Sequence, residues 1–324
     1  MREGGLSAAF LSVWVDPRRY EGDEAWARAQ ALVTAIETMI AAHPDEVVLA
    51  RTAREVREAH AAGRIAFLIG VEGAHALGDA EPAVLFARLE ELHARGARYV
   101  TLTWTSDNVF AHASTGAHPR RGLTDLGREL VTRMNALGIV VDVSHTSDAT
   151  AREAALLSSR PVLASHSATR ALGEHVRNVP DDLIAAIAER GGAICVNYYA
   201  QFVDPAYGAA RREVERAHRA EIDAIEGRSW ETNAERNVLV HRLAPELVRP
   251  PLSLLVDHVA HVVEVGGPGA ACLGSDYDGT SELAGMDDVS DLPAFFAAME
   301  ARGLPLAPIL GENVLRVLAA STGE

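Results

Sequence analysis

Four polar residues of the types that bind metal ions occur at the ends of apolar, strand-like runs. Glu72 follows RIAFLIGV, His145 ends GIVVDVSH, His166 ends PVLASHS and Asp276 ends AACLGSD. Two imidazoles and two carboxylates are ligands that zinc and similar divalent ions take in proteins. A carboxylate that bridges two ions makes such a centre binuclear, and the ions lower the pKa of bound water so that a hydroxide forms at neutral pH. The combination therefore predicts a hydrolytic metal centre.

Taken singly, each of these residues has an ordinary structural interpretation. A single histidine after a strand is more often a hydrogen-bonded core or loop residue, and a Glu-Gly pair there usually forms a turn. Their coincidence at four strand ends favours metal binding instead. The other histidines of predicted helices and loops are interpreted as structural residues: His93, His112, His118, His175, His241, His258 and His261.

The elements that must position the four residues alternate along the chain. Seven apolar, β-branched runs have the near-continuous hydrophobicity of buried parallel strands; they cover residues 8–15, 64–71, 98–104, 138–145, 161–167, 191–199 and 270–276. Helix-like segments lie between them, at 122–138 with Thr124 as N-cap and Gly138 as its end, at 147–157 and at 180–192. This alternation predicts an α/β fold, with a (β/α)8 TIM-type barrel as the first choice, and active sites of that fold lie at the carboxyl ends of the strands.

Two features depart from a regular barrel, which we otherwise expect to form one domain over residues 1–324. Residues 205–248 are long, charged and helical in pattern, and they indicate a helical insertion before the last βα unit. The strand count is seven, whereas a closed barrel of this class needs eight. Either one strand escapes the pattern or the chain lacks it, and an open sheet has two unpaired edges that folded proteins avoid.

The composition excludes several classes of partner. The 30 Lys and Arg against 45 Asp and Glu give a formal charge of −15, which repels nucleic-acid backbones. No apolar stretch approaches the roughly 18 residues of a membrane span, and the first residues carry no signal-peptide pattern. Cys195 and Cys272 are too few for a disulfide framework, so we expect buried thiols and a reducing, cytoplasmic location.

Long stretches of the chain resemble the membrane (renal) dipeptidase family of zinc peptidases. The resemblance runs through most of the sequence, and its most specific part is DVSH followed by SHS and then RNVPDD. The matching stretches are LIGVEGAHALG (68–78), RYVTLTW (98–104), GLTDLGRELVTRMNALGIVVDVSHTS (122–147), PVLASHSATRAL (161–172), RNVPDD (177–182), GGAICVN (191–197), LGSDYDG (273–279) and ILGENVLRV (309–317).

The resemblance implies a role for each candidate residue. Glu72 is similar to the carboxylate that bridges two zinc ions, and His145 and His166 to the imidazoles of the more exposed zinc. Asp276 resembles the carboxylate on the other zinc, which also passes a proton to the leaving amine, so Glu72 and Asp276 are the catalytic candidates. Arg177 matches the arginine that grips the substrate's terminal carboxylate, a task that suits a guanidinium. The expected partner is a dipeptide with a free C-terminal carboxylate, and the family resemblance also suggests a homodimer.

Two positions depart from the family pattern. Where many members have the oxyanion-binding histidine of TLTH, this chain has Trp104, as related bacterial sequences often do; its indole N–H donates a hydrogen bond but cannot become a cation. The family also begins with a strand that ends in His-x-Asp, two ligands of the buried zinc, and no such strand precedes residues 8–15. We therefore expect residues 1–324 to lack the first strand, to bind one zinc ion or none well, and to show weak or no activity.

Two other functions remain open from the sequence. A barrel that has lost its first strand could bind a peptide or partner without catalysis. A similar metal centre could instead hydrolyse another amide, a lactam or a lactone. Arg177 favours a substrate with a free carboxylate, and so the leading prediction is a metal-dependent dipeptidase that acts through a metal-bound hydroxide.

Overall fold

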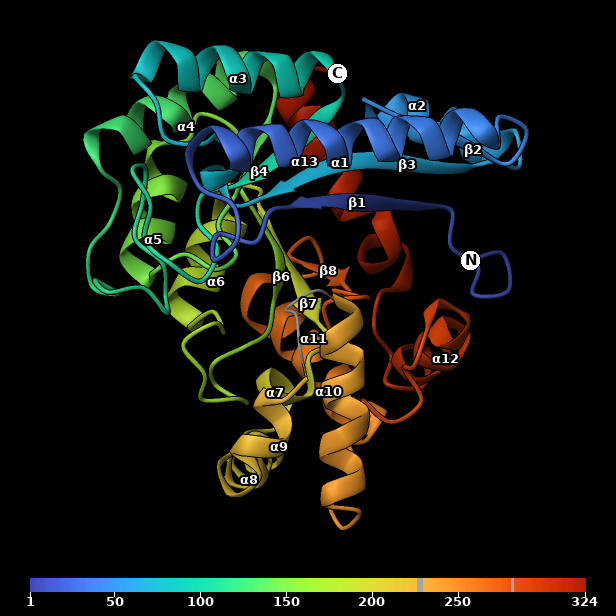
Figure 1. The fold of residues 1–324 in the computed structure, drawn as a ribbon. Coiled ribbons are helices and arrows are strands. Elements are labelled where there is room, and N and C mark those ends of the chain that lie inside the picture. The colour runs from blue at the N-terminus through green and yellow to red at the C-terminus, as the bar shows by residue number, and fades with distance from the viewer. Residues whose placement is uncertain (226–229, 281–282) are drawn as a thin grey trace.

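One parallel sheet, curled into a half-barrel, organises the chain (Figure 1). The computed structural model describes residues 1–225, 230–280 and 283–324. The strands are β1 (Ala8–Trp14), β2 (Val47–Leu49), β3 (Ile65–Glu72), β4 (Ala97–Thr101), β5 (Val140–Asp142), β6 (Leu163–Ser167), β7 (Ala193–Asn197) and β8 (Ala271–Gly274). The strand order is β1-β3-β4-β5-β6-β7-β8, and β2 pairs beside β3. Within the described ranges, β8 does not pair with β1, so the sheet stays open.

Each of the seven predicted runs contains a strand, which confirms the α/β assignment and the seven-strand path. The pattern missed β2, because three residues are too short to show a period. β2 does not close the barrel, since it pairs only with the amino-terminal part of β3, where Val47 lies opposite Ile65. β1 pairs with β3 along its whole length, from Ala8 opposite Ala66 to Trp14 opposite Glu72.

Helices follow the strands. Most of them cover the outer face of the sheet, whereas α2 and α13 pack against its inward side chains. They are α1 (Gly22–Ala42), α2 (Ala53–Ala61), α3 (Pro82–Ala94), α4 (Asp125–Leu137), α5 (Asp148–Leu157), α6 (Asp181–Glu189), α11 (Leu252–Gly266), α12 (Leu292–Ala301) and α13 (Asn313–Thr322). The predicted start and end of α4 are confirmed: the Thr124 side chain accepts a hydrogen bond from Gly127 N, and Gly138 is left-handed. Among the described helices, none is both long and apolar enough to cross a membrane.

The stretch 205–248 holds helices that stand apart from the sheet (Figure 1). After the short α7 (Ala200–Val203) come α8 (Pro205–Ala217), α9 (Arg219–Asp223) and α10 (Trp230–Leu243). Asp204 caps α8 by accepting hydrogen bonds from Ala206 N and Tyr207 N. That this stretch is an insertion within one barrel domain stays a prediction, and its residues 226–229 lie outside the described part.

Two apolar layers hold the sheet. The larger lies between the strands and the outer helices, and the smaller includes inward side chains such as Leu68, Tyr99 and Leu163. Cys195 and Cys272 belong to the smaller layer, lie opposite each other on β7 and β8, and form a disulfide. The expectation of free thiols is therefore wrong, and with it the argument for a reducing location. Spacing along the chain could not reveal that these two strands are neighbours.

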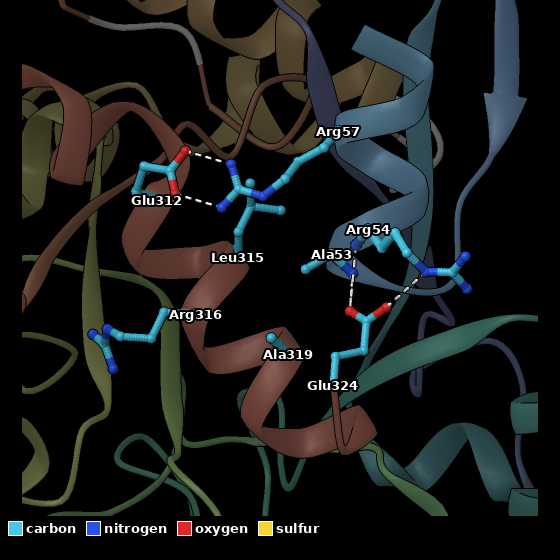
Figure 2. Close-up of a pocket in the computed structure, with 8 residues that line it drawn as sticks. All are labelled: Ala53, Arg54, Arg57, Glu312, Leu315, Arg316, Ala319 and Glu324. Carbon is cyan, nitrogen blue, oxygen red and sulfur yellow. Dashed lines mark hydrogen bonds and ion pairs between the residues drawn. The ribbon is translucent and has the colours of Figure 1, made fainter. Parts of the chain in front are cut away.

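A pocket of about 510 Å³ lies between α2 and α13 (Figure 2). Its charged side chains are engaged with their surroundings: Arg57 pairs with Glu312, and the Glu324 carboxylate accepts from Ala53 N at 2.9 Å. None of the residues that line it is one of the candidate metal ligands.

Candidate metal centre

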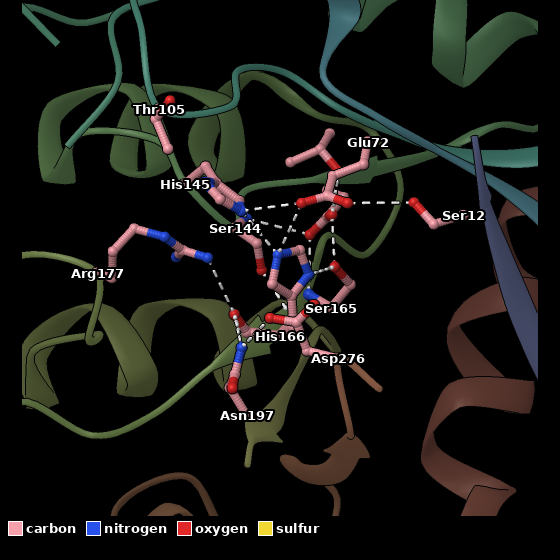
Figure 3. Close-up of polar contacts among 12 residues, drawn as sticks. Ser12, Glu72, Thr105, Ser144, His145, Ser165, His166, Arg177, Asn197 and Asp276 are labelled. Carbon is pink, nitrogen blue, oxygen red and sulfur yellow. Dashed lines mark hydrogen bonds and ion pairs between the residues drawn. The ribbon is translucent and has the colours of Figure 1, made fainter. Parts of the chain in front are cut away.

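Glu72, His145 and His166 meet at the carboxyl ends of the strands (Figure 3). Glu72 ends β3, His166 lies in β6, and His145 lies in the turn three residues after β5. Glu72 Oε1 is 3.1 Å from His145 Nε2 and 3.5 Å from His166 Nε2, and the two Nε2 atoms are 2.8 Å apart. Their side chains are 8 to 15% exposed. The three residues thus form a close, nearly dry group of metal-ligand atoms.

The orientation of His166 is set by a chain of hydrogen bonds that begins at Asp142. Ser165 Oγ donates to Asp142 Oδ2 at 2.6 Å, and so it accepts from His166 Nδ1 at 2.7 Å. Asp142 is fully buried and also accepts from Thr101 Oγ1 and from two backbone N–H groups. With its proton on Nδ1, His166 presents the lone pair of Nε2 to the centre, as a metal ligand must.

Glu72 and His145 are constrained in other ways. Ser12 Oγ donates to Glu72 Oε2 at 3.1 Å. His145 has a φ of 67°, unusual for a residue with a side chain. Ser114 N donates to its carbonyl oxygen at 2.8 Å. Backbone strain of this kind concentrates at functional sites, where surrounding contacts hold the residue in place.

The charges around Glu72 and His166 favour a bound cation. Burial raises the pKa of Glu72, but hydrogen bonds from His145 and His166 outweigh it and hold that pKa well below its usual range. Burial and the nearby Arg177 hold the pKa of His145 well below its usual value, so this ring is neutral. Burial also lowers the pKa of His166, but Glu72 and Asp276 outweigh it and raise the pKa overall. The negative charge of Glu72 and Asp276 can therefore be balanced by a proton on His166 or by a metal ion.

Asp276 lies beside this group and outside its closest set of ligand atoms. It follows β8 with a φ of 55°, and Asn197 Nδ2 donates to its Oδ2 at 3.0 Å. Burial raises its pKa and Glu72 adds to the rise, against the opposing effects of His166 and Arg177. Among the described residues, no further histidine or carboxylate joins Asp276 in a second ligand group at this centre.

Arg177 is buried on one side of the centre with unused hydrogen-bonding capacity. Its Nη2 donates to His166 O at 3.4 Å, and its guanidinium lies over the Phe202 ring at 5.2 Å. Its Nη1 is buried and has no hydrogen-bond partner in the described part of the chain. Burial lowers its pKa to about 10, against the pull of Asp276 and Glu72, so the group stays charged at neutral pH. A buried, partly unpaired cation of this kind fits an anionic ligand.

Trp104 lies next to the metal-ligand group. Its ring centroid is 6.2 Å from that of His145 and 5.0 Å from that of Trp14. Arg18 lies over the Trp104 ring at 5.5 Å, and Asp16 pairs with Arg18 at 2.7 Å. The tryptophan therefore forms part of an aromatic wall beside the histidines.

The ligand atoms of Glu72, His145 and His166 fit one divalent ion of the zinc type. Two imidazoles and one carboxylate leave a coordination position open, as in catalytic sites. A His-x-Asp sequence occurs further along the chain, at His43-Pro44-Asp45. It is exposed in the turn between α1 and β2, at the opposite end of β3 from Glu72, so it supplies no ligand here.

Four residues that support the site were not predicted from the sequence. They are Asp142 and Ser165, which orient His166, Asn197, which holds Asp276, and Ser12, which donates to Glu72. A signal existed for Asp142 and Asn197, since each is a polar residue inside or at the end of an otherwise apolar strand. Ser165 carried no signal of its own, because a serine in a strand is common.

Comparisons with known proteins agree with this geometry. The family model described as membrane dipeptidase (peptidase family M19) matches residues 1–322. Dipeptidase verJ of Clonostachys rogersoniana is 32% identical over 98% of this chain and 74% of its own length. Dipeptidase tcpJ of Claviceps purpurea is 31% identical over 98% of this chain and 67% of its own length.

Solved structures of related peptidases have a similar fold. The probable dipeptidase PvdM of Pseudomonas aeruginosa superposes with a TM-score of 0.84 at 26% identity, covering 99% of this chain and 87% of its own. A metallopeptidase of Rhodobacter sphaeroides, solved with a phosphinate mimic of the dipeptide L-Ala-D-Ala, gives a TM-score of 0.79 at 26% identity, with 99 and 88% covered. The chain belongs to the membrane dipeptidase family, peptidase family M19, and is a metallopeptidase of the dipeptidase type.

Proposed function

We propose that this protein is a zinc dipeptidase whose metal centre is formed by Glu72, His145 and His166. The observation that carries the proposal is the convergence of one carboxylate oxygen and two Nε2 atoms within 3.5 Å of one another. A zinc ion held there supplies a Lewis acid that polarises the scissile carbonyl and lowers the pKa of water. Zinc is proposed over other divalent ions because imidazole and carboxylate ligands in a site with an open position suit it.

Arg177 is the proposed anchor of the substrate. Its buried Nη1 is without a partner in the described residues, and a terminal carboxylate of a dipeptide would satisfy it. The guanidinium is already oriented by His166 O and Phe202, so little side-chain freedom is lost when the substrate binds. This selects a substrate with a free C-terminal carboxylate over a capped amide or a neutral lactone.

Asp276 is the proposed proton carrier for the departing amine. Its raised pKa favours the protonated carboxyl, as a general acid requires. Because Asn197 donates to Oδ2, the proton is expected on Oδ1. Glu72, with its lowered pKa, stays an anion and serves as ligand. The two carboxylates thus divide ligand and acid roles through their environments.

A dipeptide panel tests the proposal. The purified chain is assayed with and without zinc against dipeptides, including L-Ala-D-Ala because of the ligand in the Rhodobacter structure, and against their C-terminal amides. We expect zinc-dependent, chelator-sensitive hydrolysis of dipeptides, slow if only one ion is held, and far weaker hydrolysis of the amides. Zinc bound at Glu72 with no hydrolysis of any dipeptide would overturn the proposal and favour a non-catalytic peptide-binding barrel.

A further inference from the structure

A second group of metal-ligand side chains lies in the loop between β4 and α4. Asp107, His112 and His118, called the loop cluster here, take no part in the centre at Glu72. Asp107 Oδ2 lies 2.9 Å from His118 Nδ1 and 3.2 Å from His112 Nδ1. The two imidazole rings are 5.4 Å apart between centroids and nearly perpendicular. Both histidines were interpreted as structural from the sequence, because neither follows a strand.

The backbone of the loop fixes the Asp107 carboxylate from several sides. Oδ1 accepts from Ala113 N at 2.9 Å, and Oδ2 accepts from His118 N at 3.0 Å. Gly116 lies so close that a Cβ there would be 1.9 Å from Oδ1, so a larger residue would displace the carboxylate from this position. These contacts orient the carboxylate, and its position does not depend on a freely rotating surface side chain.

The burial of the loop cluster suits a bound ion that faces solvent on one side. The side chains of Asp107 and His112 are 17% and 16% exposed, whereas that of His118 is 51% exposed. Burial raises the pKa of Asp107, but the Ala113 N–H and the two imidazoles outweigh it and lower the pKa overall. The carboxylate is therefore ionised at neutral pH and offers a full negative charge to a cation.

One ring nitrogen of the loop cluster interacts with the carboxylate in poor hydrogen-bond geometry. His112 Nδ1 is buried and lies 3.2 Å from Asp107 Oδ2, and it forms no well-aligned hydrogen bond in the described part of the chain. Ligand atoms bonded at about 2.0–2.1 Å around a tetrahedral ion lie roughly 3.3 Å apart. The distances from Oδ2 to the two Nδ1 atoms are close to that value, so only a small opening of the cluster is needed.

We propose that Asp107, His112 and His118 bind a divalent transition-metal ion of the zinc class, separate from the centre at Glu72 and with a position open to water. Two imidazoles and one carboxylate are ligands of this class of ion. The open side faces solvent through His118. The role proposed for the ion is structural.

The loop cluster is tied to the backbone around His145. Ser147 N donates to His112 O at 2.9 Å, and Ser114 N donates to His145 O at 2.8 Å. Ala113 also forms an antiparallel bridge with Thr146. An ion in the loop cluster thus orders the segment that holds His145 in its unusual backbone conformation.

Metal titration of a protein without the first centre tests the proposal. In the Glu72→Gln/His166→Ala variant, we expect cobalt(II) to bind at one ion per chain, with visible absorption bands and a rise in melting temperature on zinc addition. A further His118→Ala or His112→Ala change should weaken binding at least tenfold and abolish the bands. His218→Ala is the matched control, because the His218 ring pairs with Glu221 in an exposed helix turn away from both ligand groups, and it should change neither result.

The proposal is overturned if the double variant binds no cobalt or zinc, or if His118→Ala leaves binding unchanged. Should the double variant fail to fold, metal analysis of the otherwise unchanged chain decides the question. The unchanged chain must then hold one more ion than the His118→Ala protein, and equal content would contradict the proposal.

Discussion

His145 and His166 direct their Nε2 atoms at each other across 2.8 Å, with Glu72 Oε1 within 3.5 Å of both. His166 lies in β6 and His145 in the turn after β5, and the two rings are oriented by different contacts. His166 is oriented through Ser165 and Asp142, whereas His145 is held by an unusual backbone conformation. The arrangement of these three side chains therefore depends on residues outside the candidate ligand group.

Loss of the hydrogen bond between Ser165 and His166 should weaken metal binding. Ser165→Ala leaves His166 Nδ1 without its acceptor and frees the ring to rotate, so we expect zinc affinity to fall about 10- to 100-fold. The check is competition with a chromophoric chelator. Ser159→Ala, at an exposed serine after α5, is the control and should leave the affinity unchanged. Equal affinities in the two variants would mean that Ser165 does not position the ligand.

Arg177 should determine the preference for a free carboxylate. Arg177→Met removes charge-assisted hydrogen bonds worth about 1.5–3 kcal/mol, so kcat/KM for dipeptides should fall roughly 10- to 100-fold. The rate for the matching dipeptide amides should change little, because they have no carboxylate to lose. An equal loss for both substrates would show that Arg177 supports the fold of the centre and not the substrate.

The free energy of unfolding should depend on pH partly through the titration of His175. Burial, followed by Arg177, lowers its pKa to about 4, and its neutral Nδ1 accepts from Arg177 N at 3.2 Å. Since the unfolded histidine takes up a proton near pH 6.5 and the folded one near 4, its contribution to stability is full above pH 6.5 and is lost as the pH falls toward 4.

His175→Gln keeps an acceptor but does not titrate. Urea unfolding at pH 7.5 and pH 5 should therefore show a smaller loss of stability in the variant, by on the order of 1 kcal/mol because the ring is partly solvated. The prediction fails if the unchanged protein and the variant lose the same stability between the two pH values.

The disulfide between β7 and β8 should contribute to stability. Cys195 and Cys272 are 77 residues apart, and a cross-link that closes a loop of that length destabilises the unfolded chain by about 4.5 kcal/mol. Thiol titration of the denatured, unreduced protein should find no free thiol, and reduction should lower the melting temperature. Two free thiols before reduction would restore the interpretation of Cys195 and Cys272 as buried thiols.

The fold could be predicted largely because buried parallel strands leave a strong sequence signal. Runs such as 64–71 are continuous in apolar residues, and caps such as Thr124 and Gly138 mark helix ends. β2 escaped because three residues show no period. The disulfide was not predicted because it depends on β7 and β8 being neighbours in the sheet, and the spacing of the cysteines along the chain does not reveal which strands are neighbours.

The site was predictable only where side-chain chemistry coincided with strand ends. Glu72, His145 and His166 satisfy that rule and lie together. The same rule predicted Asp276 as a ligand, although it lies outside that closest group. It assigned His112 and His118 a structural role, because their contact with Asp107 depends on the path of a loop. Loop paths follow from individual hydrogen bonds, and these have no periodic pattern in a sequence.

Zinc binding by the metal-free protein tests the central claim most directly. The titration uses a His118→Ala background, so that the loop cluster does not contribute, and compares it with the same protein carrying Glu72→Gln. We predict one zinc ion per chain in the first protein and an affinity at least 100-fold lower in the second, because the carboxylate supplies one of three ligands and the negative charge. Identical isotherms for the two proteins would contradict a metal centre at Glu72, His145 and His166.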